Sequence, residues 1–253
     1  MKIGIGFDKY PESYDFIATF NDISGIEGEN VIQYSQDNNP INLCEITLYQ
    51  CDLEKEKFID RFNIESELYD NSAYLYILSS KGEILTSTYI SDVKIEKIFQ
   101  DNFDNLNVII RGWLIESSKG FYEITKKRLT SGIKKLGEWK SLPAEKVQGW
   151  LDSSLRLGIY GNDKSNKYAI IDGKNLDSQD KFYCALGEEI NGIGGYFGRN
   201  LDALHDCFYG GFGITGKFTL EWLNHEVYKL KFPEYFKEIL EVFSVNNKTI
   251  ILK

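Results

Sequence analysis

The sequence predicts two folded parts of different class: an α+β domain with a mostly antiparallel sheet over residues 1–157 and an α/β domain over residues 168–253. Three observations support this prediction. β-type runs joined by tight turns dominate the first part, strands alternate with helices in the second, and a stretch rich in turn-forming residues separates them. Residues 158–167 form this predicted linker.

Composition is that of a folded protein. The chain has 253 residues, of which 42% are hydrophobic and 26% charged, proportions typical of globular domains. Two modest domains fit this length. No apolar run approaches the roughly 18 residues of a membrane span, and the first eight residues are too quickly charged for a signal peptide. We therefore expect a cytoplasmic protein with no membrane partner.

The first part shows several β-type runs with helical segments between them. The runs cover residues 41–50, 73–78, 83–89 and 106–115, with a hairpin turn at 79–82 and a tight connection at 117–120 leading to a short β-type segment at 121–124. Helices are predicted at 53–62, at 92–100 behind a Ser91 cap, and at 144–155 after Pro143. This pattern predicts an antiparallel sheet with helices.

The second part alternates strand and helix. A strand at 168–171 precedes a helix at 178–190, a glycine-rich loop at 192–195 and a short helix beginning near Asn200. A strand at 217–220, a helical stretch at 222–229, an amphipathic helix at 233–243 and a strand at 249–252 complete the chain. Strands separated by helices predict a small, mostly parallel sheet.

Net charge and cysteine content exclude some classes of function. The formal charge of -9 argues against nucleic acid as a partner, because binding to phosphates needs clustered Lys and Arg. Residues 167–253 hold 12 acidic and 10 basic residues, so most of the negative charge lies before them. The four cysteines have no metal-ligand spacing, and we expect no metal or cofactor. Cys44 and Cys51 can in principle pair, although buried thiols in a reducing compartment are the alternative that we favour.

The short helix after Asn200 has two distinct faces. Its apolar side consists of Leu201, Leu204 and Phe208, and its other side of Asp202, His205, Asp206 and Tyr209. The helix dipole alone can account for Asp202, but Asp206 lies beyond the first turn, where two carboxylates four residues apart repel each other. The acidic face therefore indicates a use outside the fold.

The loop before this helix adds two aromatic residues, Tyr196 and Phe197, next to Gly198 and Arg199. Aromatic groups beside charged groups are typical of protein interface hot spots. The run at residues 196–207, YFGRNLDALHDC, closely resembles the central motif of the barstar family, intracellular inhibitors of secreted bacterial ribonucleases. The resemblance extends over residues 167–253 and includes the segments at 169–173, 220–222, 239–243 and 249–252.

The resemblance implies a three-stranded parallel sheet covered by helices, with the motif helix and its loop plugging the active site of a basic ribonuclease toxin. Asp206 would take the place of a substrate phosphate, Asp202 would pair with a neighbouring cation, and Tyr196 would pack at the rim. Gly198 and Asn200 would shape the loop. The implied partner-binding surface also includes Phe197, His205, Gly210 and Phe212.

Two positions depart from the family pattern. His205 stands where the type protein has tryptophan, and Val245 falls where an acidic contact with the partner is expected. These differences concern the identity of the ribonuclease more than the fold.

The leading hypothesis is a non-enzymatic inhibitor of the immunity or antitoxin type. The alternative is an assembly module that uses a barstar-like domain, with the N-terminal part selecting the partner. An enzyme with its site in residues 1–154 is a third hypothesis, although that region has no histidine and no nucleophile motif. We read Glu188 and Glu189 as a solvated face, and the Gly4-Ile5-Gly6 run as a turn or a strand kink.

Overall fold

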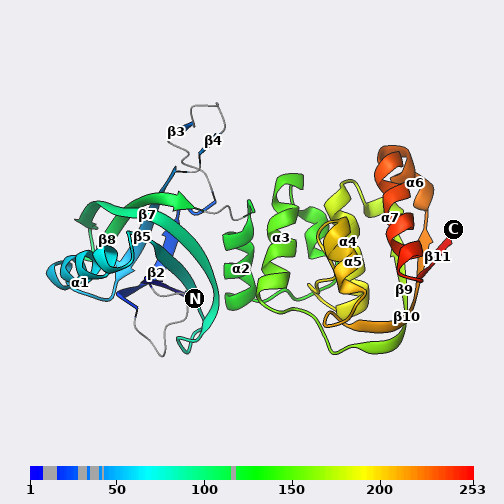
Figure 1. Ribbon diagram of the computed structural model, residues 1–253, viewed down its shortest axis with the longest axis horizontal. Helices are drawn as coiled ribbons and strands as arrows, with labels where there is room; N and C mark the ends of the chain where they lie inside the picture. The colour runs from blue at the N-terminus through cyan, green and yellow to red at the C-terminus, as the bar shows by residue number, and fades with distance from the viewer. Residues whose placement is uncertain (8–15, 28–32, 35–39, 42, 115–117) are drawn as a thin grey trace. The chain divides into compact units, whose positions relative to one another are not determined.

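The computed structural model describes residues 1–7, 16–27, 33–34, 40–41, 43–114 and 118–253 (Figure 1). The chain divides into two compact units, Met1–Tyr122 (unit 1) and Glu123–Lys253 (unit 2). This division lies well before the predicted linker at 158–167, which falls inside unit 2 and contains the start of its first strand.

Unit 1 is a closed antiparallel barrel of six strands in the order β1-β2-β5-β8-β7-β6. Closure leaves no free sheet edge in this set of strands. A two-stranded sheet lies outside the barrel, and one helix follows β5. The elements are β1 (Lys2–Gly6), β2 (Ala18–Ser24), β3 (Gln33–Tyr34), β4 (Pro40–Ile41), β5 (Leu43–Cys51), α1 (Lys55–Leu68), β6 (Ala73–Leu78), β7 (Ile84–Gln100) and β8 (Leu106–Leu114).

The mostly antiparallel character of unit 1 is as predicted, but the helix at 92–100 is wrong. These residues continue β7, which pairs with β8 as far as Gln100 opposite Leu106. The register shifts between Ser91 and Lys94, and Asp92 has a φ of 49°. The apparent cap at Ser91 therefore marks a β-bulge, and pairing within the barrel overrides local helix preference.

The segment at 121–124 also differs from its prediction, because it begins a helix, α2 (Phe121–Thr130), instead of a strand. From Ile124 onward its buried side chains join the core of unit 2. The 3-10 helix η1 (Glu138–Ser141) and α3 (Ala144–Arg156) contribute Trp139, Trp150 and Leu151 to the same core. Residues 123–157 are thus part of unit 2, and apolar burial explains why the division between units precedes them.

Unit 2 contains a three-stranded parallel sheet in the order β11-β10-β9, which confirms the predicted α/β class. Trp222 of the central strand stands between Ile171 of β9 and Leu252 of β11. The remaining elements are β9 (Lys164–Asp172), η2 (Gly173–Asn175), α4 (Gln179–Asn191), α5 (Leu201–Cys207), β10 (Ile214–Leu223), α6 (His225–Lys231), α7 (Pro233–Val245) and β11 (Thr249–Leu252).

One face of this sheet carries the core. Phe218, Leu220 and Trp222 of β10 alternate with more exposed residues, as expected for a strand with one buried face. Helix α4 packs on β9, α3 packs on α4, and α5 packs on α7 (Figure 1). The core therefore fixes α5 through the apolar residues on its inner side.

Cysteine geometry settles the alternative pairing. Cys44 and Cys51 lie seven residues apart along β5, which separates them by about 23 Å at the usual rise of an extended strand. A disulfide between them is therefore impossible. Cys184 and Cys207 are buried thiols of unit 2. Among the described residues, no helix is both long and apolar enough to cross a membrane.

Candidate protein-binding site

Helix α5 is a capped helix of two turns with one buried side. The Asn200 side chain accepts a hydrogen bond from the Ala203 amide at 2.8 Å, which satisfies one amide of the first turn. Leu204 and Cys207 are buried against the core. Burial also raises the pKa of the Cys207 thiol to about 12, so this thiol stays protonated. The buried side fixes which side chains of α5 face solvent.

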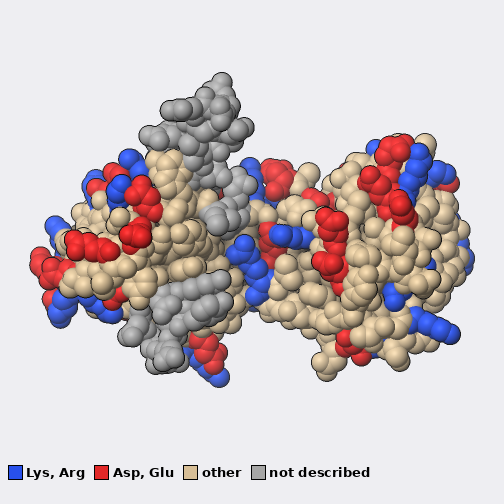
Figure 2. Space-filling view, in the orientation of Figure 1, with Lys and Arg blue, Asp and Glu red and all other residues tan. Residues whose placement is uncertain are grey.

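Asp202 and Asp206 are the acidic groups on the solvent side of α5. Both side chains are exposed, and neither makes a hydrogen bond or an ion pair with any residue that the structure describes. Asp202 and Glu238 of α7 both lie near Tyr235, whose pKa is raised by burial and then by nearby carboxylates. Figure 2 shows acidic side chains over the region of α5 and α7. This face can receive a cationic group.

The cation closest in sequence does not neutralise this face. Arg199 forms an ion pair with Asp152 of α3, whose carboxylate is buried. Gln148 of the same helix donates to the Arg199 carbonyl at 3.2 Å. Helix α3 therefore holds the start of the motif, and its Asp152 pairs with the Arg199 guanidinium, which remains 42% exposed. The carboxylates of α5 therefore form no ion pair with the cation nearest to them in sequence.

The glycine-rich loop before α5 is held on both sides of Gly194. The Gly194 amide donates to Oε1 of Glu188 at 3.0 Å, and its carbonyl accepts from Nη1 of Arg128 at 3.2 Å. Oε2 of Glu188 also accepts from the Gly137 amide and from Nε1 of Trp139, both at 2.7 Å. Such bonds to charged groups are stronger than neutral ones, so this loop is anchored to α2, η1 and α4.

A second set of bonds fixes the loop after α5. Nδ2 of Asn191 donates to the carbonyls of Tyr196 at 2.6 Å and of Phe212 at 2.9 Å. The Asp163 carboxylate accepts from the amides of Gly211 and Gly213 at 2.8 and 2.9 Å. Gly210 has a φ of 113°, a backbone conformation that favours glycine. Both loops that flank α5 are therefore preorganised.

The structure corrects the placement of Tyr196 and Phe197. Tyr196 is 2% exposed and Phe197 is fully buried, so neither lies at a solvent-facing rim. Tyr196 donates its amide to the Ile159 carbonyl, and its ring packs on Phe212, which also packs on Tyr160. Sequence could not show this burial, because residues 159–160 come from the predicted linker and cover the motif only in three dimensions.

Gly198 occupies the tightest point of the motif. It has a φ of 87°, and a Cβ there would lie 3.0 Å from Cα of Leu204. Glycine is therefore required both by conformation and by the close approach of the loop to α5.

His205 links α5 to α7. Nδ2 of Asn246 donates to Nδ1 of His205 at 2.7 Å and to the Val242 carbonyl at 2.7 Å. An amide nitrogen can only donate, so Nε2 of His205 carries the proton and donates to the Tyr209 hydroxyl at 3.1 Å. Val245, where the family pattern expects an acid, is 61% exposed on α7. The α7 side of the surface is thus less acidic than the resemblance implies.

Sequence reasoning missed three residues that build the site: Arg128, Asp163 and Glu188. Glu188 was expected on a solvated face, but it is buried with three N–H donors, whereas its neighbour Glu189 is exposed. The i, i+3, i+4 pattern of α4 could have placed Glu188 on its buried side beside Cys184. The donors to its carboxylate come from distant segments and leave no local signal.

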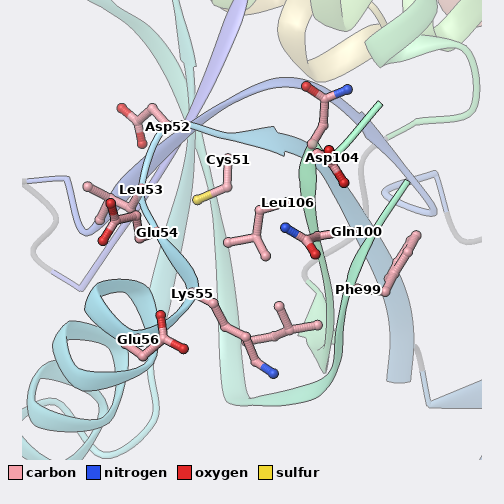
Figure 3. A pocket seen from close by; sticks show the side chains of 12 residues that line it. Cys51, Asp52, Leu53, Glu54, Lys55, Glu56, Phe99, Gln100, Asp104 and Leu106 are labelled. Atoms are coloured by element: carbon pink, nitrogen blue, oxygen red, sulfur yellow. The ribbon is translucent and has the colours of Figure 1, made fainter. Parts of the chain in front are cut away.

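Unit 1 has a separate open cavity of about 670 Å³ between the end of β5, the start of α1 and the β7–β8 turn (Figure 3). Its polar lining includes Asp52, Glu54, Lys55 and Asp104. Burial raises the pKa of the Cys51 thiol in this cavity to about 11, so the thiol is a poor nucleophile near neutral pH. The lining supplies no histidine to act as its base. Among the described residues, no cluster of side chains can hold a metal ion.

Unit 2 is an α/β domain with an exposed acidic helix between two braced loops. Residues 166–250 match the sequence model of the barstar family, described as barnase inhibitor. The match confirms the resemblance for the C-terminal third of the chain, and no family model matches the N-terminal region. No curated protein shows significant similarity to the chain.

Proposed function

We propose that this protein inhibits a basic ribonuclease by inserting the acidic face of α5 into the active site of the enzyme. The observation that carries the proposal is the pair of exposed carboxylates, Asp202 and Asp206, which have no partner among the described residues and stand on a helix within the barstar match. A ribonuclease binds the phosphates of RNA through cationic side chains, and carboxylates of the inhibitor complement such a site.

In this mechanism Asp206 occupies the position of a substrate phosphate, and Asp202 pairs with a cation beside it. Burial of these pairs in the complex excludes RNA by steric overlap and by charge competition, with no chemical step. The braced loops lower the entropic cost of binding, because the surface is ordered before the partner arrives. The overall charge of -9 adds long-range attraction to a basic enzyme.

The biological role that fits this action is immunity against a ribonuclease toxin. An immunity protein must meet the toxin inside the producing cell, and buried thiols such as Cys184 and Cys207 suit a reducing cytoplasm. The inhibitor acts by occlusion and is not itself an enzyme.

An inhibition assay tests the proposal. The purified full chain is titrated into barnase, and into any ribonuclease encoded beside the gene for this chain, with cleavage of a fluorogenic RNA as the readout. We expect inhibition at a one-to-one ratio for at least one nuclease. Asp206→Ala should weaken it by about 30-fold or more, the size of an interface hot spot.

Glu67→Ala is the matched control, since Glu67 is an exposed acid on α1 of unit 1 and its loss changes the net charge equally. We expect this variant to inhibit within about twofold of the natural protein, because a single distant surface charge contributes little. Equal inhibition by the Asp206→Ala variant and the natural protein would contradict the proposal.

A non-inhibitory assembly module is the second candidate, and the exposed Val245 favours it. A surface of this kind can bind a partner through apolar contact on α7 without using Asp206. The Asp206→Ala variant separates the two candidates, because assembly through α7 would survive that substitution.

A further inference from the structure

Tyr209 is the most exposed aromatic side chain of unit 2, all of whose residues the structure describes. Its exposed fraction is 73%, against 51% for Tyr168 and 39% for Tyr160. It lies two residues after the end of α5, and its amide donates to the Asp206 carbonyl at 3.0 Å. The tyrosine therefore stands one helical turn after Asp206, beside the acidic face.

The ring of Tyr209 is exposed yet held in place. Its hydroxyl accepts from His205, and the two rings pack edge to face with centroids 5.1 Å apart. His205 is held in turn by Asn246, so the position of the ring is tied to α7. A side chain that is ordered before binding loses little conformational entropy in a complex. This order distinguishes Tyr209 from an ordinary mobile surface residue.

Tyr196 cannot serve as the aromatic contact, because it is 2% exposed. Its backbone is bonded on both sides, to Ile159 and to Asn191. Exposing its ring would require the break-up of the contacts among Tyr196, Phe212 and Tyr160. An aromatic anchor beside α5 must therefore come from another residue.

We propose that Tyr209 is this anchor and that it binds an arginine of the partner, whose guanidinium stacks on the ring while it pairs with Asp206. The inference rests on the proposed function. Aromatic faces attract cations, arginine most often, and a planar guanidinium can stack on a ring and bond a carboxylate at the same time. A nucleic-acid base is disfavoured as the stacking partner, because its phosphates would approach the carboxylates of Asp202 and Asp206.

His205 acts as a positioning residue in this account. It does not need to touch the partner, since its role is to hold the Tyr209 ring against α5. Replacement of His205 should therefore weaken binding only because it releases the Tyr209 ring.

The test measures the dissociation constants of full-length variants for barnase and for any ribonuclease encoded beside this chain's gene. Tyr209→Ala should weaken binding by about tenfold or more, whereas Tyr209→Phe, which keeps the ring, should stay within about fivefold. Tyr209→Leu keeps apolar area but has no aromatic face, and it should resemble Tyr209→Ala. The double variant of His205→Ala and Tyr209→Ala should bind no more weakly than Tyr209→Ala.

Tyr168→Ala is the control for loss of an exposed tyrosine elsewhere on unit 2, and circular dichroism checks that each variant is folded. If Tyr209→Ala binds like the natural protein while Asp206→Ala does not, Tyr209 is not an anchor, and the proposed function stands. If Tyr209→Leu binds as tightly as Tyr209→Phe, the partner does not stack an arginine on the Tyr209 ring. If the natural protein binds neither nuclease, the proposed function and this inference both fail.

Discussion

At the scale of single residues, the glycine-rich loop before α5 depends on two charged groups of unit 2, the buried Glu188 and the half-buried Arg128. Glu188 and Arg128 hold the amide and the carbonyl of Gly194, and Glu188 also accepts from Trp139. Removal of a buried partner of this kind costs about 1–3 kcal/mol, because the remaining groups lose their hydrogen bonds. The position of α5 thus also depends on charged groups whose hydrogen bonds lie within unit 2.

Glu138 gives unit 2 a defined response to acid. Hydrogen bonds from Lys127 and then from the Lys134 amide lower the pKa of Glu138 from 4.5 to about 2. Because the pKa is lower in the folded state, the stabilisation is complete above about pH 4.5 and is lost as the pH falls toward 2. Urea unfolding at pH 6 and pH 3 should show a smaller loss of stability for Glu138→Gln than for the natural protein. Identical losses would contradict this assignment.

At the scale of elements, α4 and the glycine-rich loop approach each other closely. A Cβ on Gly187 in the middle of α4 would lie 2.3 Å from the carbonyl oxygen of Gly195 and 3.1 Å from the Phe197 amide. The loop therefore packs directly on the helix backbone, without an intervening side chain. The position of α5 depends on this contact, since Gly195 and Phe197 lead directly into the motif.

Gly187→Ala tests this contact. Alanine in a helix interior normally stabilises by about 1 kcal/mol relative to glycine, but here the added methyl group must displace the loop. We expect a lower free energy of unfolding in urea and faster amide hydrogen exchange at Gly194 and Phe197. Gly161→Ala is the comparison, because a Cβ at Gly161 would meet only the Asn191 side chain, at 3.5 Å, and the position has no positive φ. A stabilised Gly187→Ala variant would show that the loop does not need the close approach.

Sequence patterns predicted elements well where periodicity and caps are local. The capped helix after Asn200, the strands at 73–78 and 249–252 and the amphipathic helix after Pro233 all appear. The helix at 92–100 failed, because a bulge beside Asp92 and pairing with β8 decide its conformation. The burial of Tyr196 was equally hidden, since it depends on contacts with segments 36 and 16 residues away along the chain, around Tyr160 and Phe212.

At the scale of the whole molecule, unit 2 is larger than its family match. The match begins at residue 166, whereas the compact unit begins at Glu123. Trp139, Trp150 and Leu151 come from the added segment, and all three are buried in the same core as Phe182 and Trp222. Residues 123–157 therefore share the core of unit 2.

Two fragments test this extent. Each large buried side chain contributes roughly 1.5–3 kcal/mol, and loss of several approaches the whole stability of about 5–15 kcal/mol. We expect the fragment 123–253 to unfold cooperatively in urea, with a near-ultraviolet signal from its buried aromatic rings. The fragment 158–253 should lack that transition. A cooperative transition in the shorter fragment would mean that the added segment is dispensable.

Competition with a nucleoside 3′-monophosphate tests most directly whether the acidic face of α5 occupies the phosphate site of a ribonuclease. The dissociation constant of the full chain for the inhibited nuclease is measured at increasing nucleotide concentration. If the nucleotide and the inhibitor bind the same cations, the apparent dissociation constant should rise in proportion to the nucleotide concentration once the nucleotide saturates its site on the nuclease. A dissociation constant that stays unchanged with nucleotide bound would contradict the claim.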